Sequence, residues 1–454
     1  MIALGDRRLE GETYLTAGYR IRAQVRAGKI STVPMSKLAK IWQPNRLAGV
    51  QVDRQHGTPF FTATQVFDIK PKARKWLASG RTPDLEGRYV KPGWILVTCS
   101  GSVGDSIISH SPHDGVIISH DLLRVQPYED GNQGFLYAYL KSGYCRPMMK
   151  STKYGNIIKH LEPEHVQELP VPLVSEDVRK ELGALMSEVF RLRDEAFRLM
   201  EKAEARYVAG LGLKSSALAP ESSYEVPASE MFDETRRLDG FFYNPEAEVA
   251  IRALKGSGHN VVPLASVVDR VFGMPRFKHI YKPEGIPYLD SEDLFKVNPE
   301  IEKFIPPSAK KNAKAYFVQR NWLLMACSGQ LYGINGSVVL ANVWHEGKIV
   351  SNHVLRIVPK KGGLRPGYLQ VALGHPLFGR PLVMRCAFGT EVPEIAPEDV
   401  ERIPVVEPPS DLESEMSDLV ERVVALRLQA DAQETEAVGR LEKTLEEIIG
   451  RPAK

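Results

Sequence analysis

Two stretches of the chain carry apolar residues at alternating spacings of four and three positions. The first series comprises Val178, Leu182, Leu185, Val189, Leu192, Ala196, Leu199 and Ala203. The second comprises Leu412, Met416, Leu419, Val423, Leu426 and Ala430, falters at Gln433, and resumes with Ala437, Leu441, Leu445 and Ile448. This heptad pattern predicts two long amphipathic helices that end near Gly210 and Gly450. Ser175 and Ser410 are the expected N-caps of these helices.

A lone amphipathic helix of about 34 residues would span roughly 50 Å and leave its apolar stripe exposed. We therefore expect the two helices to cover each other as an antiparallel pair. In that pair, the packing residues would be Val178, Leu182, Leu185, Val189 and Leu192 on one helix, and Leu412, Met416, Leu419, Val423 and Leu426 on the other. The alternative is that each helix packs only on the domain that precedes it.

The same motifs occur twice, in the same order. The segment from Trp94 reads WILVTCSGSVG, and the segment from Trp322, 228 positions later, reads WLLMACSGQLYG. Four more pairs follow at similar offsets: GTPFF with GIPYL, RLEGETY with RLDGFFY, ISHDLLRV with VSNHVLRI, and LEPEHVQELPVP with IAPEDVERIPVV. This order indicates a duplicated unit. Two copies of one fold can be related by a pseudo-twofold axis, which suits a partner that is itself roughly twofold, with duplex DNA as the leading candidate.

Short apolar runs bounded by turn residues, such as 94–98 and 322–326, predict strands between short helices. The predicted fold class is α/β in the α+β sense, with two pseudo-symmetric mixed α/β domains joined by two long antiparallel coiled-coil helices. The predicted boundaries are 1–30 for an N-terminal lead-in, 31–173 for the first domain, 174–211 for the first helix, 212–256 for a linker and second lead-in, 257–407 for the second domain, and 408–450 for the second helix.

Composition and charge narrow the class of protein. A chain of 454 residues is too long for one ordinary core, and its formal net charge of +3 means that any basic surface must be local. The four cysteines form no CxxC or Cys/His cluster, which argues against a zinc site and favours a reduced, cytoplasmic setting. No signal-peptide pattern or run of about 18 apolar residues occurs, so we expect no membrane association.

Catalytic signatures are few. No P-loop motif is present, and the glycine pairs at 101 and 104 and at 329 and 333 lack the third glycine of a dinucleotide site. A tight turn between strands is the simpler interpretation of both pairs. The Asn-Pro strings of the chain lack the second proline and the aromatic residue of an amino-methyltransferase loop. We therefore expect a non-catalytic chain without its own metal or cofactor.

Loop residues of both copies suit nucleic acid, because Lys and Arg contact phosphates while Asn, Gln, Ser and Thr recognise base edges. The candidates in the first copy are Lys70, Lys72, Arg74, Lys75, Arg81, Ser102, Lys153, Tyr154, Asn156 and Lys159. Those in the second copy are Arg276, Lys278, His279, Tyr281, Lys282, Lys311, Gln330, Tyr332, Arg385 and Thr390. For each residue alone, a plain solvated loop is the alternative. Two different half-sites would require this combination of a shared scaffold and divergent polar loops.

The segment RLDGFFYNPE, the strand and glycine-rich turn from Gly93 to Gly104, and LEPEHVQELPVPLV followed by a heptad helix occur in a recognisable order. This ordered set resembles the specificity subunits of type I restriction–modification systems over nearly the whole chain. Trp94 and Trp322 stand where that family commonly has an acidic residue. The N-terminal lead-in, RLEGETY, is a weaker copy of the family pattern.

The resemblance implies two target recognition domains, each binding one half of a bipartite double-stranded DNA site, with the helices fixing the gap between the halves. It also implies docking of two DNA adenine methyltransferase (M) subunits and recruitment of restriction (R) motor–nuclease subunits. S-adenosylmethionine, ATP and Mg²⁺ would belong to those partners. Three alternatives stay open: a DNA-recognition subunit of another phage-defence or modification system, a fused modification–restriction enzyme, and a scaffold that does not bind DNA. The missing methyl-donor motif opposes the fused enzyme.

Overall fold

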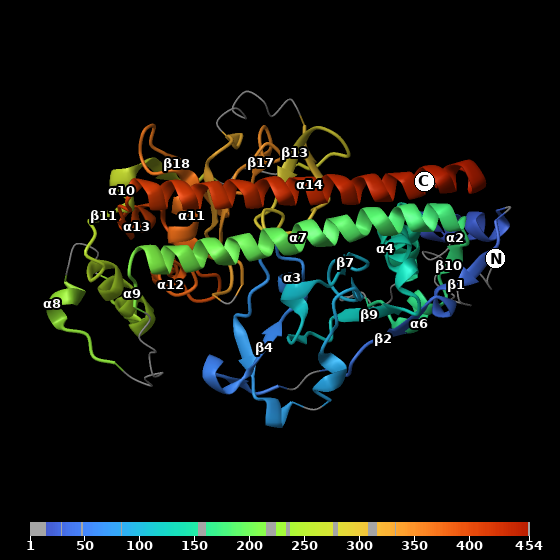
Figure 1. Ribbon diagram of the computed structural model, residues 1–454, viewed down its shortest axis with the longest axis horizontal. Coiled ribbons are helices and arrows are strands. Elements are labelled where there is room, and N and C mark those ends of the chain that lie inside the picture. Colours follow the sequence, from blue (N-terminus) through green and yellow to red (C-terminus); the bar gives the residue numbers. More distant parts are fainter. Residues whose placement is uncertain are drawn as a thin grey trace. The chain divides into compact units, whose positions relative to one another are not determined.

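The computed structural model describes residues 15–28, 30–46, 49–82, 84–152, 160–214, 224–232, 237–275, 280–306, 316–331 and 333–452. The chain divides into unit 1, built from Met1–Glu195 and Arg427–Lys454, and unit 2, built from Ala196–Leu426. Each unit is a mixed α/β body that includes parts of two long helices (Figure 1). None of the helices in the described ranges combines the length and apolar composition that a membrane crossing requires.

Among the described residues of unit 1, one four-stranded sheet has the order β2-β9-β6-β7, a second has the order β3-β5-β4-β8, and β1 pairs with β10. All pairings are antiparallel except that of β4 with β8. The strands are β1 (Thr32–Pro34), β2 (Ala39–Trp42), β3 (Gln51–Val52), β4 (Thr58–Phe61), β5 (Lys75–Leu77), β6 (Ile95–Thr98), β7 (Ser106–Ile108), β8 (Ile117–Ile118), β9 (Leu122–Pro127) and β10 (Pro170–Pro172).

The described part of unit 2 repeats this plan. Its sheets have the orders β12-β18-β15-β16 and β14-β13-β17, and β11 pairs with β19. The strands are β11 (Val261–Pro263), β12 (Val268–Phe272), β13 (Ile286–Leu289), β14 (Lys303–Ile305), β15 (Leu323–Ala326), β16 (Val338–Leu340), β17 (Ile349–Val350), β18 (Val354–Pro359) and β19 (Pro404–Val406). The central strands β6 and β15 are buried along their whole length, which explains their unbroken apolar sequences.

Short helices surround these sheets. In unit 1 they are α2 (Ala17–Ala27), α3 (Ala63–Val66), α4 (Gln133–Lys141), α5 (Cys145–Thr152) and α6 (Pro163–Gln167). In unit 2 they are α8 (Ala228–Met231), α9 (Pro245–Lys255), α10 (Leu264–Val267), α11 (Pro366–Gly374), α12 (Arg380–Arg385) and α13 (Pro397–Glu401). The prediction of short helices between the strands is confirmed.

The two long helices are α7 (Glu176–Gly210) and α14 (Ser410–Ile449), and they run side by side in opposite directions (Figure 1). In unit 1, Arg193 of α7 forms ion pairs with Asp431 and Glu434 of α14. In unit 2, Arg206 pairs with Glu415, at 2.7 Å. Higher numbers on α7 therefore meet lower numbers on α14 in both units, as the antiparallel prediction requires.

The buried stripe differs in part from the predicted one. Val178, Leu185 and Leu419 are only partly buried. The fully buried residues of α7 are Leu182, Met186, Val189, Leu192, Ala196, Met200, Ala203 and Tyr207, and those of α14 include Leu412, Met416, Val420, Val423, Leu426, Ala430, Ala437, Leu441 and Leu445. The stripe is shifted because each long helix must cover a short helix of its own unit as well as the other long helix.

Glycines mark these additional contacts. A Cβ at Gly134 of α4 would lie 2.8 Å from the carbonyl oxygen of Leu182, and one at Gly367 of α11 would lie 2.8 Å from Cα of Ser417. Each long helix therefore packs on a domain as well as on the other long helix, so the alternative that it packs only on a domain is wrong. Ser175 is confirmed as an N-cap, since its hydroxyl accepts from the Val178 amide at 3.4 Å. Ser410 is the first helical residue rather than the cap.

Candidate nucleic-acid interface

A glycine-rich turn follows the buried strand β6 in unit 1. Gly101 and Gly104 have φ values of +68° and +87°, a region that strongly favours glycine. The Thr98 hydroxyl fixes the turn internally, donating to the Ser102 carbonyl and accepting from the Asp105 amide at 3.0 Å. Ser102 is therefore an exposed side chain on a backbone of defined conformation.

The corresponding turn of unit 2 follows β15. Gly329 and Gly336 have φ values of +128° and +74°, and the predicted candidate Gln330 is exposed. The amide of Asn335, which is fully buried, donates to the carbonyl oxygens of Gly329 at 3.1 Å and Pro393 at 3.0 Å. Asn335 thus ties the turn to a second loop around residue 393.

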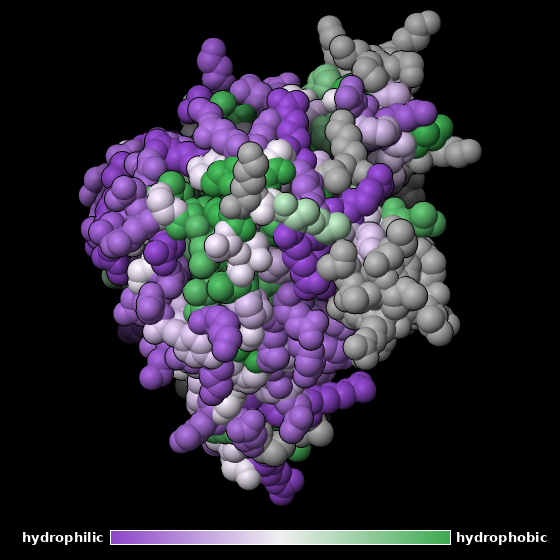
Figure 2. Space-filling model, turned by 90° about the vertical axis from the view of Figure 1, so that its right-hand side faces the viewer, coloured by the Kyte–Doolittle hydropathy of each residue, from purple (hydrophilic) through white to green (hydrophobic). Residues whose placement is uncertain are grey.

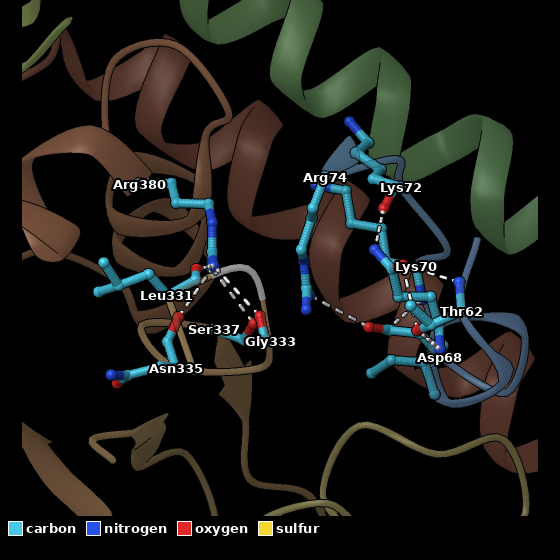
Figure 3. Close-up of polar contacts among 12 residues, drawn as sticks. Thr62, Asp68, Lys70, Lys72, Arg74, Leu331, Gly333, Asn335, Ser337 and Arg380 are labelled. Atoms are coloured by element: carbon cyan, nitrogen blue, oxygen red, sulfur yellow. Dashed lines mark hydrogen bonds and ion pairs between the residues drawn. The ribbon is translucent and has the colours of Figure 1, made fainter. Parts of the chain in front are cut away.

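An arginine holds each turn, and the sequence analysis did not identify either one. Arg380, at the start of α12, donates to the carbonyl oxygens of Asn335 at 2.9 Å, Gly333 at 3.4 Å and Leu331 at 3.5 Å (Figure 3). In unit 1, Arg146 of α5 forms an ion pair with Asp105 at 2.5 Å. The sequence repeat could have identified them. Arg146 and Arg380 lie 234 positions apart, which is also the offset between LEPEHVQELPVP and IAPEDVERIPVV, the paired segments that follow them.

The loop at 388–394 lies beside the turn of unit 2. Phe388 and Glu394 exchange two backbone hydrogen bonds of 2.9 and 2.8 Å, and the Gly329 amide donates to the Pro393 carbonyl at 3.2 Å. Phe388 is 45% exposed at the start of this loop, and the predicted candidate Thr390 is also exposed. Gln330, Phe388 and Thr390 are therefore exposed on two loops of unit 2 that backbone hydrogen bonds join.

In unit 1, a backbone hydrogen bond likewise joins the strand end before the glycine-rich turn to a residue that follows the loop at 153–159. The Leu161 amide donates to the Cys99 carbonyl at 2.9 Å, just as Ile395 donates to Cys327 at 2.8 Å in unit 2. The loop itself, with the candidates Lys153, Tyr154, Asn156 and Lys159, lies outside the described residues.

Arg237, from the RLDGFFY motif, stabilises the loop of unit 2. Its guanidinium donates to the carbonyl oxygens of Cys386 and Ala387, both at 3.3 Å, and pairs with Asp399 at 3.2 Å. It also lies 5.8 Å from the centre of the Phe388 ring. This contact gives the second-copy motif a structural reason to precede its domain, and the first-copy motif lies outside the described residues.

The basic segment of unit 1 is a partly buried cluster rather than a solvated loop. The Asp68 carboxylate accepts from the Lys70 amide at 2.9 Å and pairs with Arg74 at 3.5 Å (Figure 3). Gln65 donates to the carbonyl of Lys72 at 3.0 Å. Burial, together with the charges of Lys72 and Arg427, holds the pKa of Lys70 well below its usual range. The segment therefore has a fixed conformation.

Two further candidates of unit 1 lie near the small sheet. Lys75 begins β5 and is partly buried, whereas Arg81 is exposed. Between them, Trp76 has the guanidinium of Arg54 over its ring at 5.9 Å. An aromatic ring flanked by cations is a surface that can contact both bases and phosphates.

Unit 2 places its described basic candidates on the corresponding sheet. Tyr281 is 44% exposed, with the Lys303 ammonium 5.5 Å above its ring. Lys282 is exposed, and its amide donates to the Phe304 carbonyl at 2.9 Å. The candidates Arg276, Lys278, His279, Lys311 and Tyr332 lie outside the described residues.

Arg385 has a structural role that the sequence analysis did not predict. Its side chain is 13% exposed, pairs with Glu248 of α9 at 3.0 Å, and lies 4.0 Å from the centre of the Phe242 ring. A guanidinium held in this way joins α12 to α9 and to the motif of Arg237. Its contact with DNA stays a prediction beside this structural role.

The described residues contain no group of three or more His, Cys, Asp or Glu side chains that could hold a metal ion. Burial raises the pKa of the Cys99 and Cys327 thiols to about 12. Both thiols are therefore neutral near pH 7 and behave as small buried apolar groups.

No protein-family model matches the chain, and no curated protein matches it. Structural comparison aligns 94% of it with 97% of the type I restriction–modification S subunit from M. genitalium, at 13% identity and a TM-score of 0.35. It aligns 93% of the chain with 97% of the HsdS subunit from Thermoanaerobacter tengcongensis, at 15% identity and a TM-score of 0.27. A third match is a chain from a structure of type I R-M complex assembly and conformational transition, with 16% identity, a TM-score of 0.28, and coverage of 94% and 99%.

Proposed function

We propose that this chain is the DNA-specificity subunit of a type I restriction–modification complex, in which each unit recognises one half of a bipartite double-stranded site. One observation carries the proposal: both units hold a glycine-rich turn with an arginine, yet they expose different residues there. Ser102 is exposed in unit 1 and Gln330 in unit 2. Recognition of two different base sequences requires the same turn in both units with different exposed polar side chains on it.

The helix pair suits the task of spacing the two half-sites. Major-groove half-sites recur about every 34 Å along a duplex. At 1.5 Å per residue, the 35 residues of α7 extend over roughly 50 Å. An antiparallel pair of this length supports a role in setting the gap between the recognised halves.

The proposal assigns the methyl-transfer and cleavage chemistry to partner subunits. Two M subunits would bring S-adenosylmethionine, R subunits would bring ATP and Mg²⁺, and this chain would bring sequence recognition without catalysis. Figure 2 looks onto the part of unit 1 that carries α2 and the C-terminal end of α14, and it shows apolar side chains gathered near the centre of that face. An exposed apolar area of this kind supports the docking of a protein partner.

The experiment co-expresses the chain with its M subunits and sequences the methylated positions of the host genome. The expected result is a methylated bipartite motif that is lost when the chain is omitted. DNA binding by the purified complex should also weaken steeply with salt, as phosphate contacts require. Assembly with M subunits but without methylation or salt-dependent DNA binding would favour the scaffold that does not bind DNA.

A further inference from the structure

Unit 1 contains a buried ionic cluster within the helix pair. The Glu434 carboxylate, on α14, is fully buried and accepts from Arg193 of α7 at 2.5 Å and from the Tyr137 hydroxyl of α4 at 3.2 Å. Lys141, also on α4, pairs with the other oxygen of the same carboxylate. Asp431 lies 3.2 Å from Arg193 at the edge of the cluster. Two elements of unit 1, α7 and α4, therefore donate to a single side chain of a third, α14.

Such a cluster is costly to build in an apolar seam. Removing charges from water costs several kcal/mol for each ion, and well-packed apolar residues of similar volume often serve stability as well or better. The Arg193 Nη1 atom is buried without a hydrogen-bond partner in the described structure, so even the assembled cluster is not fully satisfied. Stability alone therefore gives no reason for placing Glu434 in this seam.

The equivalent position in the other copy of the repeat is apolar. Each of the buried residues Leu182, Met186, Val189, Leu192, Ala196, Ala203 and Tyr207 of α7 has a buried counterpart 234 positions later on α14. By the same offset, Glu434 corresponds to Met200, which is 2% exposed. Tyr137 and Lys141 correspond to Gln370 and Gly374 of α11, since Gly134 and Gly367 pack equivalently. Unit 2 therefore has Met200 where unit 1 has a buried carboxylate.

The shared burial pattern creates an ambiguity in pairing. Because α7 and α14 bury side chains at equivalent positions, α7 of a second copy has the shape to take the place of α14 beside α7 of the first copy. That exchange would place Met200 where Glu434 lies, and it would leave Arg193 and Lys141 of both copies without a carboxylate. A buried unpaired charge is among the largest penalties in protein stability, and single buried polar residues are known to fix helix partners in coiled coils.

We propose that Glu434, bound by Arg193, Lys141 and Tyr137, selects the pairing of α7 with α14 of the same chain and rejects pairing with α7 of a second copy. The cluster thus determines partner choice between two nearly equivalent helices. This role does not depend on DNA binding.

The test co-expresses two full-length copies that carry different affinity tags, and measures how much of the second tag is captured through the first. The triple variant Lys141→Met, Arg193→Met and Glu434→Met makes the three buried charged positions apolar, while Asp431 stays at the edge with its side chain 31% exposed. We expect this variant to melt cooperatively near the wild-type temperature, with capture of the second tag raised about tenfold or more. Glu436→Met, which alters an exposed glutamate two positions from Glu434, is the control and should match the wild type.

Two single variants complete the design. Glu434→Met leaves Arg193 and Lys141 charged and should lower the melting temperature more than the triple variant does. Glu434→Gln keeps the shape of the side chain and removes only its charge, so it should raise mixed-tag capture even if the triple variant does not fold. Wild-type capture by the folded glutamine variant, or by a folded triple variant, overturns the proposal.

Discussion

Arg124 and Arg356 make the same three hydrogen bonds, each within its own unit. Arg124 donates to the carbonyl oxygens of Ile118, Ser119 and Leu122, at 2.8, 2.9 and 2.5 Å. Arg356 donates to those of Val350, Ser351 and Val354, at 2.6, 3.2 and 2.5 Å. Both side chains are almost completely buried, and burial lowers their pKa values to about 9 and about 10. Each guanidinium therefore joins the end of one strand to the start of the next, β8 to β9 in unit 1 and β17 to β18 in unit 2.

The substitution Arg124→Met should destabilise unit 1 by several kcal/mol, because each orphaned buried carbonyl costs about 1–3 kcal/mol. Arg356→Met should do the same to unit 2. Hydrogen–deuterium exchange is the suitable measurement, since it reports the stability of each unit separately. Protection lost equally in both units after either substitution would contradict the assignment of each arginine to its own unit.

Replacing Arg380 by Met should loosen the glycine-rich turn of unit 2 and reduce affinity for target DNA about tenfold, since the turn loses three carbonyl contacts. Recognition of only one half-site should relax. The measurement is binding to a panel of duplexes in which each half of the motif is varied separately. Arg191→Met removes an exposed arginine of α7 and serves as the control. Equal relaxation at both half-sites would rule out a local effect of Arg380.

Phosphate contacts and base contacts should separate in their salt dependence. Lys72→Ala should weaken binding to all sequences alike and reduce the slope of log K against log salt by about one unit. Thr390→Ala should leave that slope unchanged and cost about 1–3 kcal/mol at one position of the motif. Titrations at several salt concentrations measure both. A changed slope for Thr390→Ala would show that this residue contacts phosphate instead.

A charge within the helix pair should be far more damaging on the buried stripe than beside it. Val420→Asp places a carboxylate at a fully buried position and should cost several kcal/mol, whereas Leu419→Asp alters a partly buried one and should cost less. Met186→Asp and Leu185→Asp form the same comparison on α7. Thermal unfolding of the four variants measures the difference. If Leu419→Asp lowered the melting temperature as much as Val420→Asp, Leu419 would belong to the buried stripe, as the heptad count predicts.

Unit 1 should lose stability in acid through His113, which is fully buried and lies 3.0 Å from the Val66 carbonyl. Burial, aided by the nearby His110, lowers its pKa from 6.5 to about 3. Below pH 6.5 the unfolded chain binds a proton here that the folded chain rejects until about pH 3. The stabilising effect of the depressed pKa is therefore present above pH 6.5 and is lost as pH falls, by about 1.4 kcal/mol per unit.

The comparison is with His113→Gln, whose side chain does not titrate. Its unfolding free energy should depend less steeply on pH between 6.5 and 3 than that of the wild type. Parallel profiles for the two proteins in this range would exclude His113 as the group responsible.

The sequence predicts the mixed α/β class, the two long helices and their antiparallel direction, because these depend on periodicity and on a repeat visible in the residues themselves. It misses which of two neighbouring apolar residues, such as Leu419 and Val420, becomes buried. That choice depends on a short helix that packs on the other side of the long one, and the heptad count contains no information about it.

Predicting the candidate interface from the sequence is harder. Exposed tips such as Ser102 and Gln330 follow from their positions after a strand, whereas the roles of Arg380 and Arg385 depend on tertiary contacts. Arg385, a candidate DNA contact, also packs against Phe242, and Arg380, which was not a candidate, holds the turn. A guanidinium can contact DNA or hold protein segments together, and its neighbours in the fold determine which of these it does.

The discontinuity of unit 1 has a consequence for how the chain is made. Unit 2 is one continuous stretch, whereas unit 1 needs residues from both sides of it. The Gln24 side chain donates to the Ile449 carbonyl at 2.9 Å, and the Tyr144 hydroxyl donates to that of Gly450 at 2.7 Å. On a ribosome, unit 2 has all its residues first, so the usual N-to-C order of domain folding is inverted. Until Glu434 is synthesised, Lys141 and Arg193 of unit 1 have no carboxylate to pair with. Unit 1 therefore stays unfolded, and accessible to chaperones and proteases, for longer than its early position in the chain suggests.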